Sequence, residues 1–198
     1  PNCNVLTVGS GGSLMAGAGF DGFGGVTQMS QIFLTRMSST MAIVCWRKYV
    51  SNTSGAGTCF TLTMSGQTLS EGSNLALDNS DVAWPSVTPL SSSRAVVCWQ
   101  KYIHPWQSKC ATLTVSGTSL SKSSSIFINN GAKAGNPSVE SLSNSTAVVC
   151  YRDTFPATTK HECIHISVGA DNSLSLSTTF EVRSSTANQM GTSVLSDD

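Results

Sequence analysis

The stretch Ala42–Trp46 reads AIVCW, and the chain repeats it as AVVCW at Ala95–Trp99 and as AVVCY at Ala147–Tyr151. The cysteines of these three copies are 53 and 52 residues apart. A second cysteine follows each copy after a short interval: Cys59, Cys110 and Cys163. A fixed period of about fifty residues indicates a repeat architecture. The fold is therefore expected to consist of several similar units.

One repeat divides into four short segments, which in the middle repeat are 85–91, 95–99, 110–117 and 119–129. Each segment alternates apolar and polar residues or forms a short β-branched run, and each is bounded by Gly, Ser, Asn or Pro. Both patterns are typical of β-strands. Apolar residues nowhere keep helical spacing across three turns, so the sequence predicts an all-β fold.

Four strands in about fifty residues are what one blade of a β-propeller contains. The predicted fold is a β-propeller of four-stranded antiparallel blades, with three whole blades and parts of another at both termini. We expect residues 1–198 to form a single propeller or propeller segment. Its whole blades are expected at about 26–78, 84–130 and 137–183, and the partial blade at 1–20 and 190–198.

Three stretches resemble the extracellular YxD-type repeat propellers: AVVCYRD at 147–153, LTVSGTSL at 113–120 and PSVESLS at 137–143. The blades of that family loosely resemble those of sialidases and tachylectin-like lectins. The wording is also similar to repeats of protist and algal proteins. The resemblance implies a blade and no particular activity. The SxDxGxTW Asp-box of sialidases does not occur in the sequence.

The paired cysteines lie on neighbouring antiparallel strands, where opposed residues come close enough for a disulfide. The predicted bridges are Cys45–Cys59, Cys98–Cys110 and Cys150–Cys163. Each would close a loop of about 15 residues, for which the chain-entropy model gives about 3 kcal/mol of stabilisation. The competing interpretation is a zinc site, but the spacing contains no CxxC pair. Disulfides predict an oxidising compartment.

Cys3 is the unpaired seventh cysteine, and it aligns with the third-strand cysteines. Its partner would belong to a second strand that precedes residue 1. The chain also stops after a first strand, where another AVVCW strand is due. Two explanations remain: the sequence is an excerpt of a longer propeller, or another chain supplies the second strand of a fourth blade.

The charge balance excludes several kinds of partner. The chain has 11 basic and 11 acidic residues, and charged residues make up only 11% of it, against about 25% in ordinary domains. Without a basic patch, neither nucleic acid nor an anionic membrane is an expected partner. Because no apolar run approaches about 18 residues, no membrane span is expected either.

The candidate ligand-binding residues are Tyr102, His104 and Trp106, which lie together in one loop between strands. Exposed aromatic side chains can stack on sugars or anchor a protein partner. The alternative is local packing on Pro105. The aromatic side chains at the end of each AVVCW copy belong to the predicted core instead.

Little in the sequence supports a metal site or catalysis, and no cofactor is expected. His161, Cys163 and His165 form an HxCxH motif on one strand face, but the cysteine is already assigned to a disulfide. No GxSxG motif is present, and no motif links the candidate carboxylates for glycoside hydrolysis. These carboxylates belong to Asp21, Asp78, Asp81, Glu140 and Asp153.

Two N-glycosylation sequons, at Asn52 and Asn144, lie in predicted turns. They agree with a secreted glycoprotein, and an organelle lumen such as that of the thylakoid is the alternative location. The expected function is a non-enzymatic interaction or scaffold module in a larger assembly. Its partners would be other protein subunits or a missing part of its own chain. A glycan-binding lectin is the second hypothesis, and a sialidase-like hydrolase is the third.

Overall fold

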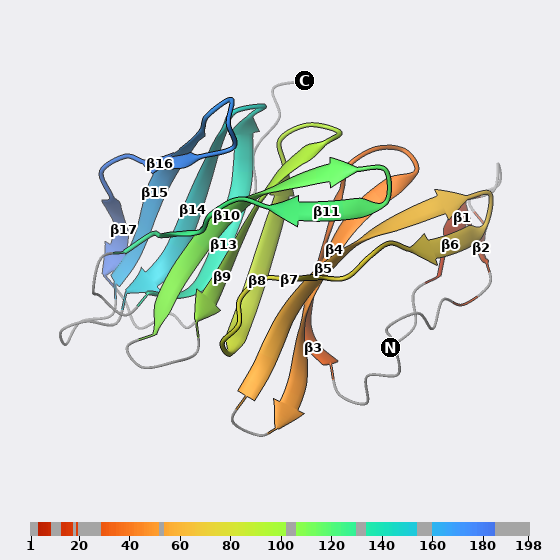
Figure 1. Ribbon diagram of the computed structural model, residues 1–198, viewed down its shortest axis with the longest axis horizontal. Helices are drawn as coiled ribbons and strands as arrows, with labels where there is room; N and C mark the ends of the chain where they lie inside the picture. Colours follow the sequence, from red (N-terminus) through yellow and green to blue (C-terminus); the bar gives the residue numbers. More distant parts are fainter. Residues whose placement is uncertain are drawn as a thin grey trace.

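The computed structural model describes residues 4–8, 13–17, 19, 29–51, 54–101, 106–129, 134–153 and 160–184. In these ranges every regular element is a β-strand, which confirms the all-β prediction. The strands form three antiparallel sheets with the layout of propeller blades and one small two-stranded sheet (Figure 1). No helix of the described residues is long and apolar enough to cross a membrane.

The three blades share one strand order: the first four strands pair in chain order, and the fifth, short strand pairs with the third. Blade 1 contains β3 (Met29–Arg36), β4 (Met41–Ser51), β5 (Ser54–Ser65), β6 (Thr68–Glu71) and β7 (Leu75–Ala76). Blade 2 contains β8 (Val82–Pro89), β9 (Arg94–Lys101), β10 (Gln107–Ser116), β11 (Ser119–Lys122) and β12 (Ile126–Phe127). Blade 3 contains β13 (Ala134–Ser143), β14 (Thr146–Asp153), β15 (Lys160–Val168), β16 (Leu174–Leu176) and β17 (Phe180–Ser184). The small sheet contains β1 (Leu6–Val8) and β2 (Leu14–Ala16).

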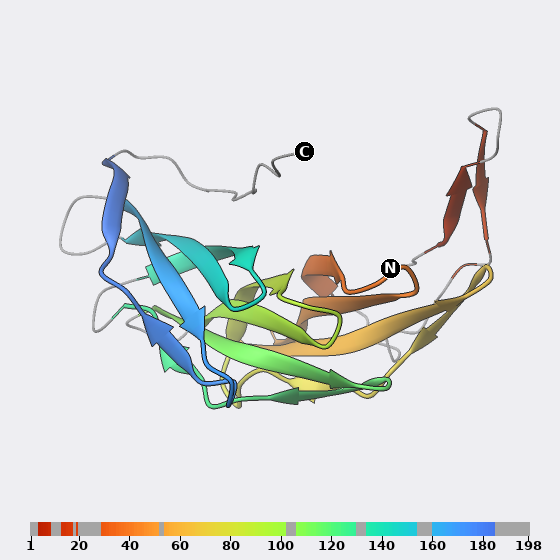
Figure 2. The same ribbon diagram turned by 90° about the horizontal axis from the view of Figure 1, so that it is seen from above.

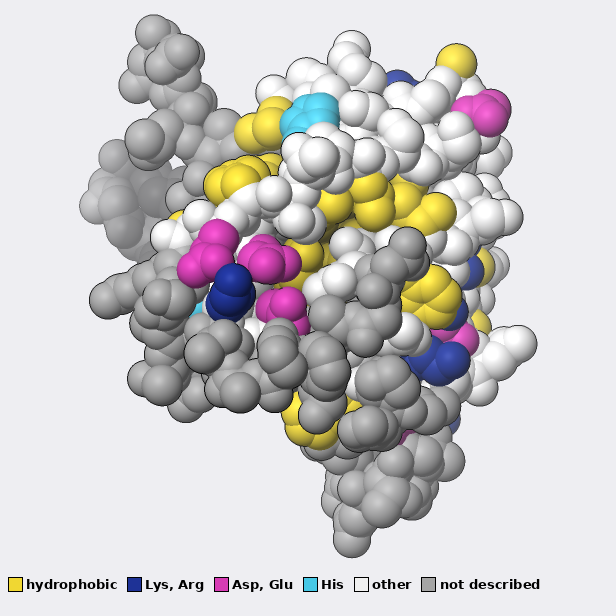
Figure 3. Space-filling view, turned by 90° about the vertical axis from the view of Figure 1, so that its left-hand side faces the viewer, with side chains coloured by type: hydrophobic (Ala, Val, Ile, Leu, Met, Phe, Trp, Pro, Cys, Tyr) yellow, Lys and Arg dark blue, Asp and Glu magenta, His cyan; other side chains and the backbone are white. Residues whose placement is uncertain are grey.

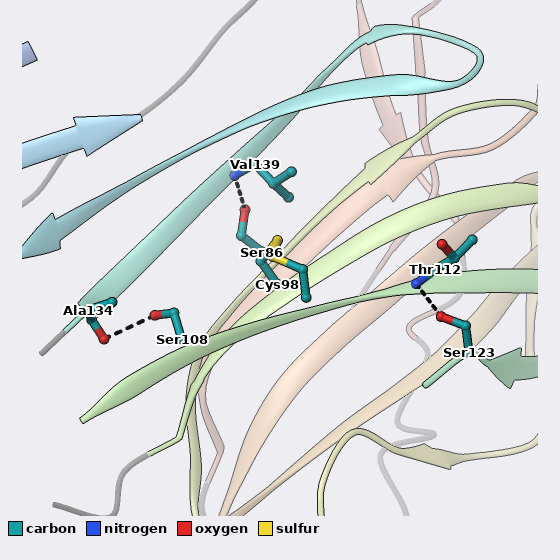
Figure 4. The surroundings of a disulfide bond; sticks show 8 residues. Ser86, Cys98, Ser108, Thr112, Ser123, Ala134 and Val139 are labelled. Carbon is teal, nitrogen blue, oxygen red and sulfur yellow. Dashed lines mark hydrogen bonds between the residues drawn. A yellow bond between two sulfur atoms is a disulfide. The ribbon is translucent and has the colours of Figure 1, made fainter. Parts of the chain in front are cut away.

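The fourth strand of each blade is split, although the sequence predicted one continuous segment at 119–129. In blade 2, β11 and β12 pair with successive parts of β10 and are separated by three serines. The Ser123 hydroxyl accepts a hydrogen bond from the Thr112 N–H at 3.0 Å, and it donates one to the Ser124 carbonyl (Figure 4). A serine side chain thus replaces one ladder contact and bends the strand.

The three predicted cysteine pairs are disulfide-bonded in the structure: Cys45–Cys59, Cys98–Cys110 and Cys150–Cys163. Each bridge joins directly opposed residues of the second and third strands of its blade. Three disulfides indicate an oxidising compartment.

Strand alternation gives each blade two different faces. One face carries the disulfide and packs against the following blade, so Cys45 and Cys59 share a core cluster with Trp99. The opposite face carries the aromatic residue of the AVVCW-type strand and packs against the preceding blade. As predicted, these aromatic side chains are core residues, and Trp99 and Tyr151 are completely buried.

A bulge interrupts the first strand of every blade, and the sequence pattern did not reveal it. Gln31, Trp84 and Asn136 have positive φ angles of 55°, 51° and 51°, each at a break in pairing register. This left-handed conformation is unfavourable for a non-glycine residue. Side chains from the preceding blade fix two of the bulges. Gln31 Oε1 accepts the Trp84 N–H at 2.7 Å, and Gln100 Oε1 accepts the Asn136 N–H at 3.2 Å.

The small sheet lies at the end of the stack formed by blade 1 (Figure 2). The Gly17 backbone lies close to the Gln67 carbonyl oxygen in the β5–β6 turn. The small sheet is therefore placed on the face of blade 1 that looks away from blade 2. The predicted strand at 190–198 and Cys3 lie outside the described residues.

Candidate functional site

The outer face of blade 3 exposes an apolar position that blades 1 and 2 bury. Met37, Leu90 and Leu142 correspond to one another at the end of the first strand. Met37 and Leu90 are each 7% exposed because the following blade covers them, whereas Leu142 is 52% exposed. Phe180 and Val182 on β17 are exposed as well. Blade 3 thus presents an open apolar face (Figure 3).

At the opposite end of the stack, blade 1 also exposes an apolar position that is buried between blades. This position lies on the face that carries the aromatic residue of the AVVCW-type strand. Leu34, Val87 and Val139 correspond because each pairs with the third residue of the AVVCW-type strand. Val139 is 3% exposed beneath blade 2, whereas Leu34 is 58% exposed. The two ends of the stack therefore expose complementary halves of the interface that is closed between the blades.

A cavity of about 470 Å³ lies at the blade 1 end, between Leu34 and β1. Leu34, Leu62 and Leu69 provide apolar lining from blade 1, and Val5 and Leu6 do so from the small sheet. This composition suits an apolar occupant better than a charged one. The two open faces and this cavity form the candidate functional site.

Two polar side-chain contacts join the second, third and fifth strands of blade 3. Lys160 Nζ lies 2.8 Å from Glu181 Oε2, and the Tyr151 hydroxyl donates to Glu162 Oε2 at 3.0 Å. Burial, together with the negative charge of Glu162, raises the pKa of the Tyr151 hydroxyl above its ordinary value of 10.0. Tyr151 is therefore a protonated, buried hydrogen-bond donor to Glu162.

The scattered carboxylates of the sequence serve contacts within the fold. Asp81 pairs with Arg47 at 3.2 Å, and Asp78 pairs with Lys109 at 2.8 Å. Glu140 accepts a hydrogen bond from the Thr88 hydroxyl at 3.4 Å. Asp21 lies outside the described residues.

The HxCxH motif does not form a metal site in the described part of the chain. Cys163 is disulfide-bonded, His161 is buried and His165 is half-buried. Within the described ranges, no group of three or more His, Cys, Asp or Glu side chains could hold a metal ion.

Only part of the predicted aromatic loop can be placed. Trp106 is 40% exposed just before β10, while Tyr102 and His104 lie outside the described residues. Of the two sequons, Asn144 is exposed in the turn between β13 and β14. Its carbonyl accepts a hydrogen bond from Arg94 at 3.0 Å. Asn52 lies outside the described residues.

Sequence reasoning missed Leu34 and Leu142, although the signal was present. When the repeats are aligned, both positions are apolar in every repeat. The alignment therefore marks both positions as apolar columns of the repeat, and the structure shows that these two members are exposed.

No family model matches the sequence. No curated protein matches it either. Among solved structures, the chain is similar to the subtype N11 neuraminidase-like protein of a flat-faced bat isolate from Peru. The identity is 6%, the TM-score is 0.42, and the match covers 75% of this chain. The chain spans only about half of that structure, 52% of its length.

Proposed function

We propose that this chain is a non-enzymatic protein-interaction module that works as a peripheral part of a larger assembly. The observation that carries the proposal is the exposure of Leu142 and Leu34, whose counterparts inside the stack are covered by another blade. Contiguous exposed apolar surface is typical of protein interfaces. The ion pairs and hydrogen bonds of the candidate carboxylates also favour a binding role over catalysis.

A secreted location fits this proposal, and an organelle lumen such as that of the thylakoid is the alternative. Disulfide bonds persist in both oxidising spaces. Exposure of Asn144 is compatible with glycosylation in the secretory pathway. Detection of a glycan on Asn144 by mass spectrometry would favour secretion.

The test is the mass of the native particle. The protein would be isolated without denaturant from the cells that produce it and examined by native mass spectrometry. We expect a particle heavier than the 20.7 kDa of residues 1–198, containing at least one further polypeptide. The Leu142→Glu variant should lose partner protein if blade 3 supplies the contact. A particle that contains no second polypeptide would contradict the proposal.

A lectin is the second candidate because the Trp106 indole is partly exposed beside β10. Exposed indole rings provide a large flat surface for sugars. A glycan array with the wild-type protein and the Trp106→Ala variant tests this candidate directly. Wild-type binding that the variant lacks would favour a lectin, and the absence of any bound glycan would remove it.

A further inference from the structure

The small sheet is the outer half of a further blade. The Gly17 N–H donates to the Val5 carbonyl at 2.8 Å, as the Gly72 N–H does to the Thr61 carbonyl at 2.8 Å. In blade 1 this hydrogen bond lies at the end of the ladder between the third strand, β5, and the fourth, β6. In the small sheet it lies at the same end of the ladder between β1 and β2. In each case the same glycine lies against the β-turn of the next blade, Gln67 for Gly17 and Thr118 for Gly72. The approach of Gly17 to the β5–β6 turn of blade 1 therefore corresponds to the approach of Gly72 to the β10–β11 turn of blade 2.

In the three complete blades, the third strand is paired on both edges. Just past its last residue paired with the second strand, the third strand donates one more backbone hydrogen bond. The acceptor is the carbonyl of the residue that precedes the second strand. The three bonds, each 2.8 Å long, are Met64 to Thr40, Val115 to Ser93 and Val168 to Ser145. Val8 occupies the corresponding position of β1. Among the described residues β1 pairs with β2 alone, so its other edge carries no strand.

The ladder geometry shows which groups of β1 face the open edge. Because Gly17 and Val5 are hydrogen-bonded to each other, the next pair along the ladder, Leu6 and Ala16, is not. The Leu6 N–H thus points away from β2, and so does the Val8 N–H. The N–H groups of Leu6 and Val8, with the Leu6 carbonyl between them, can therefore form backbone hydrogen bonds with another strand.

Blade 1 provides the floor on which such a strand would lie. The cavity of about 470 Å³ adjoins β1 and is lined by Leu34 and Leu62. At the interface between blades 2 and 3, a second strand, β9, lies over the counterpart of this floor, and its Val96 and Cys98 share a core cluster with Val139. The open edge and the apolar floor together match one occupant: an extended strand with alternating apolar residues.

Resting on the proposed interaction function, we infer that the open edge of β1 binds a further β-strand of the A-[IV]-V-C-[WY] type, in addition to the three that residues 1–198 contain. The strand adds to β1 by backbone hydrogen bonds and places its second and fourth side chains on Leu34 and Leu62. This is β-augmentation, in which the strand edge gives affinity and the side-chain pockets give specificity. The three copies of this motif in residues 1–198 already form β4, β9 and β14.

The probe is a fluorescent peptide with the sequence of Ser93–Lys101, in which Cys98→Ser prevents thiol exchange. Its binding to residues 1–198 is followed by fluorescence anisotropy. The control peptide carries Val97→Pro. Cys98 and Cys110 form a closely spaced, non-hydrogen-bonded pair, with Cα atoms 4.1 Å apart. Because the two kinds of pair alternate along an antiparallel ladder, the N–H of the neighbouring Val97 points toward the third strand. Saturable binding of the first peptide, at least about tenfold tighter than the second, is expected.

Two matched pairs of protein variants locate the site. Leu6→Pro removes an N–H on the open edge, whereas Ala16→Pro removes one on the outer edge of β2. Leu34→Glu places a charge on the floor, whereas Ser121→Glu places one at an exposed position of β11 in blade 2. Leu6→Pro and Leu34→Glu should each weaken peptide binding by about tenfold or more, and the two controls should leave it unchanged.

Three outcomes would overturn the inference: no peptide binding, equal binding of both peptides, or binding that Leu34→Glu does not weaken. Circular dichroism and thermal melting check that each variant is folded. If Leu6→Pro fails to fold, Leu34→Glu still decides, because Leu34 is an exposed side chain. A native particle that contains a second polypeptide, combined with absent peptide binding, would reject this site and leave the interaction function standing.

Discussion

The two interfaces inside the blade stack bury corresponding apolar residues but differ in their polar contacts. Between blades 1 and 2 the contacts include ion pairs, Arg47–Asp81 at 3.2 Å and Lys109–Asp78 at 2.8 Å, although Asp81 and Asp78 themselves belong to the connection that joins these blades. Between blades 2 and 3 they are mainly neutral (Figure 4). There Ser86 accepts from the Val139 N–H at 3.1 Å, and Ser108 donates to the Ala134 carbonyl at 3.1 Å.

The comparison teaches that one blade geometry tolerates either kind of polar contact. The apolar columns decide how the blades stack, because they recur in every repeat. The polar contacts then determine how each interface responds to substitution and to pH. Buried charges are costly to leave without their partner, whereas a neutral hydrogen bond contributes only about 1 kcal/mol.

The largest effect is expected from Asp81→Ala. Asp81 and Arg47 are both buried, and Asp81 Oδ1 also accepts the Gly55 N–H at 2.6 Å. Removal of one partner from a buried ion pair costs about 3–5 kcal/mol. At the neutral interface, Ser86→Ala should cost only about 1–2 kcal/mol. Urea denaturation of both variants measures the difference, and equal losses would show that the charge does not distinguish the interfaces.

Leu90→Ala comes next in expected size. Leu90 lies in the core between blades 2 and 3, so its truncation should lower the free energy of unfolding by about 2–4 kcal/mol. Leu142→Ala truncates the corresponding residue on the open face and should cost less than about 0.5 kcal/mol. Thermal or urea unfolding of the isolated chain gives both values. A similar cost at the two positions would mean that something covers Leu142 in solution.

A third substitution, Gly72→Ala, tests the close approach between blades 1 and 2. An added Cβ would meet the Thr118 carbonyl oxygen and the Thr61 hydroxyl, which are hydrogen-bonded to each other. We expect a loss of about 1–3 kcal/mol because the backbone must shift. Ser123→Ala changes the corresponding position of blade 2 without any steric clash and removes the two hydrogen bonds of the Ser123 hydroxyl, at about 1 kcal/mol each or less. A harmless Gly72→Ala would show that the two blades can move apart.

The smallest effect is a pH dependence of the interface between blades 1 and 2. Desolvation raises the pKa of Asp78, but the hydrogen bond and charge of Lys109, with the Ser80 hydrogen bonds, outweigh it and hold the pKa below 3.8. A depressed folded pKa contributes stability above the unfolded pKa, and this contribution is lost as pH falls through the folded value. Asp78→Asn should therefore cost up to about 1 kcal/mol near neutral pH.

The difference between wild type and Asp78→Asn should disappear in acid, well below pH 3.8, where the wild-type carboxylate is protonated too. Urea denaturation at neutral and at acidic pH measures it. Ser108→Ala, at the neutral interface, should give the same loss at both pH values. A constant Asp78→Asn effect would show that the Lys109 contact is not electrostatic.

The strands and the disulfides could be predicted because they depend on local patterns. Alternating residues around Cys98 and Cys110 place both sulfur atoms on one face, and neighbouring antiparallel strands oppose them directly. The bulges could not be predicted in the same way. Trp84 has a positive φ angle because contacts with Gln31 of another blade support it, and a strand pattern contains no trace of that contact.

In the candidate site, too, one feature was predicted from the sequence and another was not. The aromatic loop was predicted from residue type, and of its three residues only Trp106 is described, with its indole partly exposed. Leu34 and Leu142 resemble core residues in the sequence, since both positions are apolar in every repeat. Their exposure depends on which neighbours the chain provides, and that is a property of position in the stack.

The repeated AVVCW-type strand by itself determined the repeat, the all-β fold and the three bridges, because each follows from side-chain spacing within about fifty residues. Tertiary structure alone decided which faces of the end blades are exposed and, among the described residues, which backbone groups of β1 face away from β2. Burial and backbone pairing are satisfied by residues far apart in the sequence, so the free edge beside Leu6 and the exposed Leu34 become visible only once the blades are stacked.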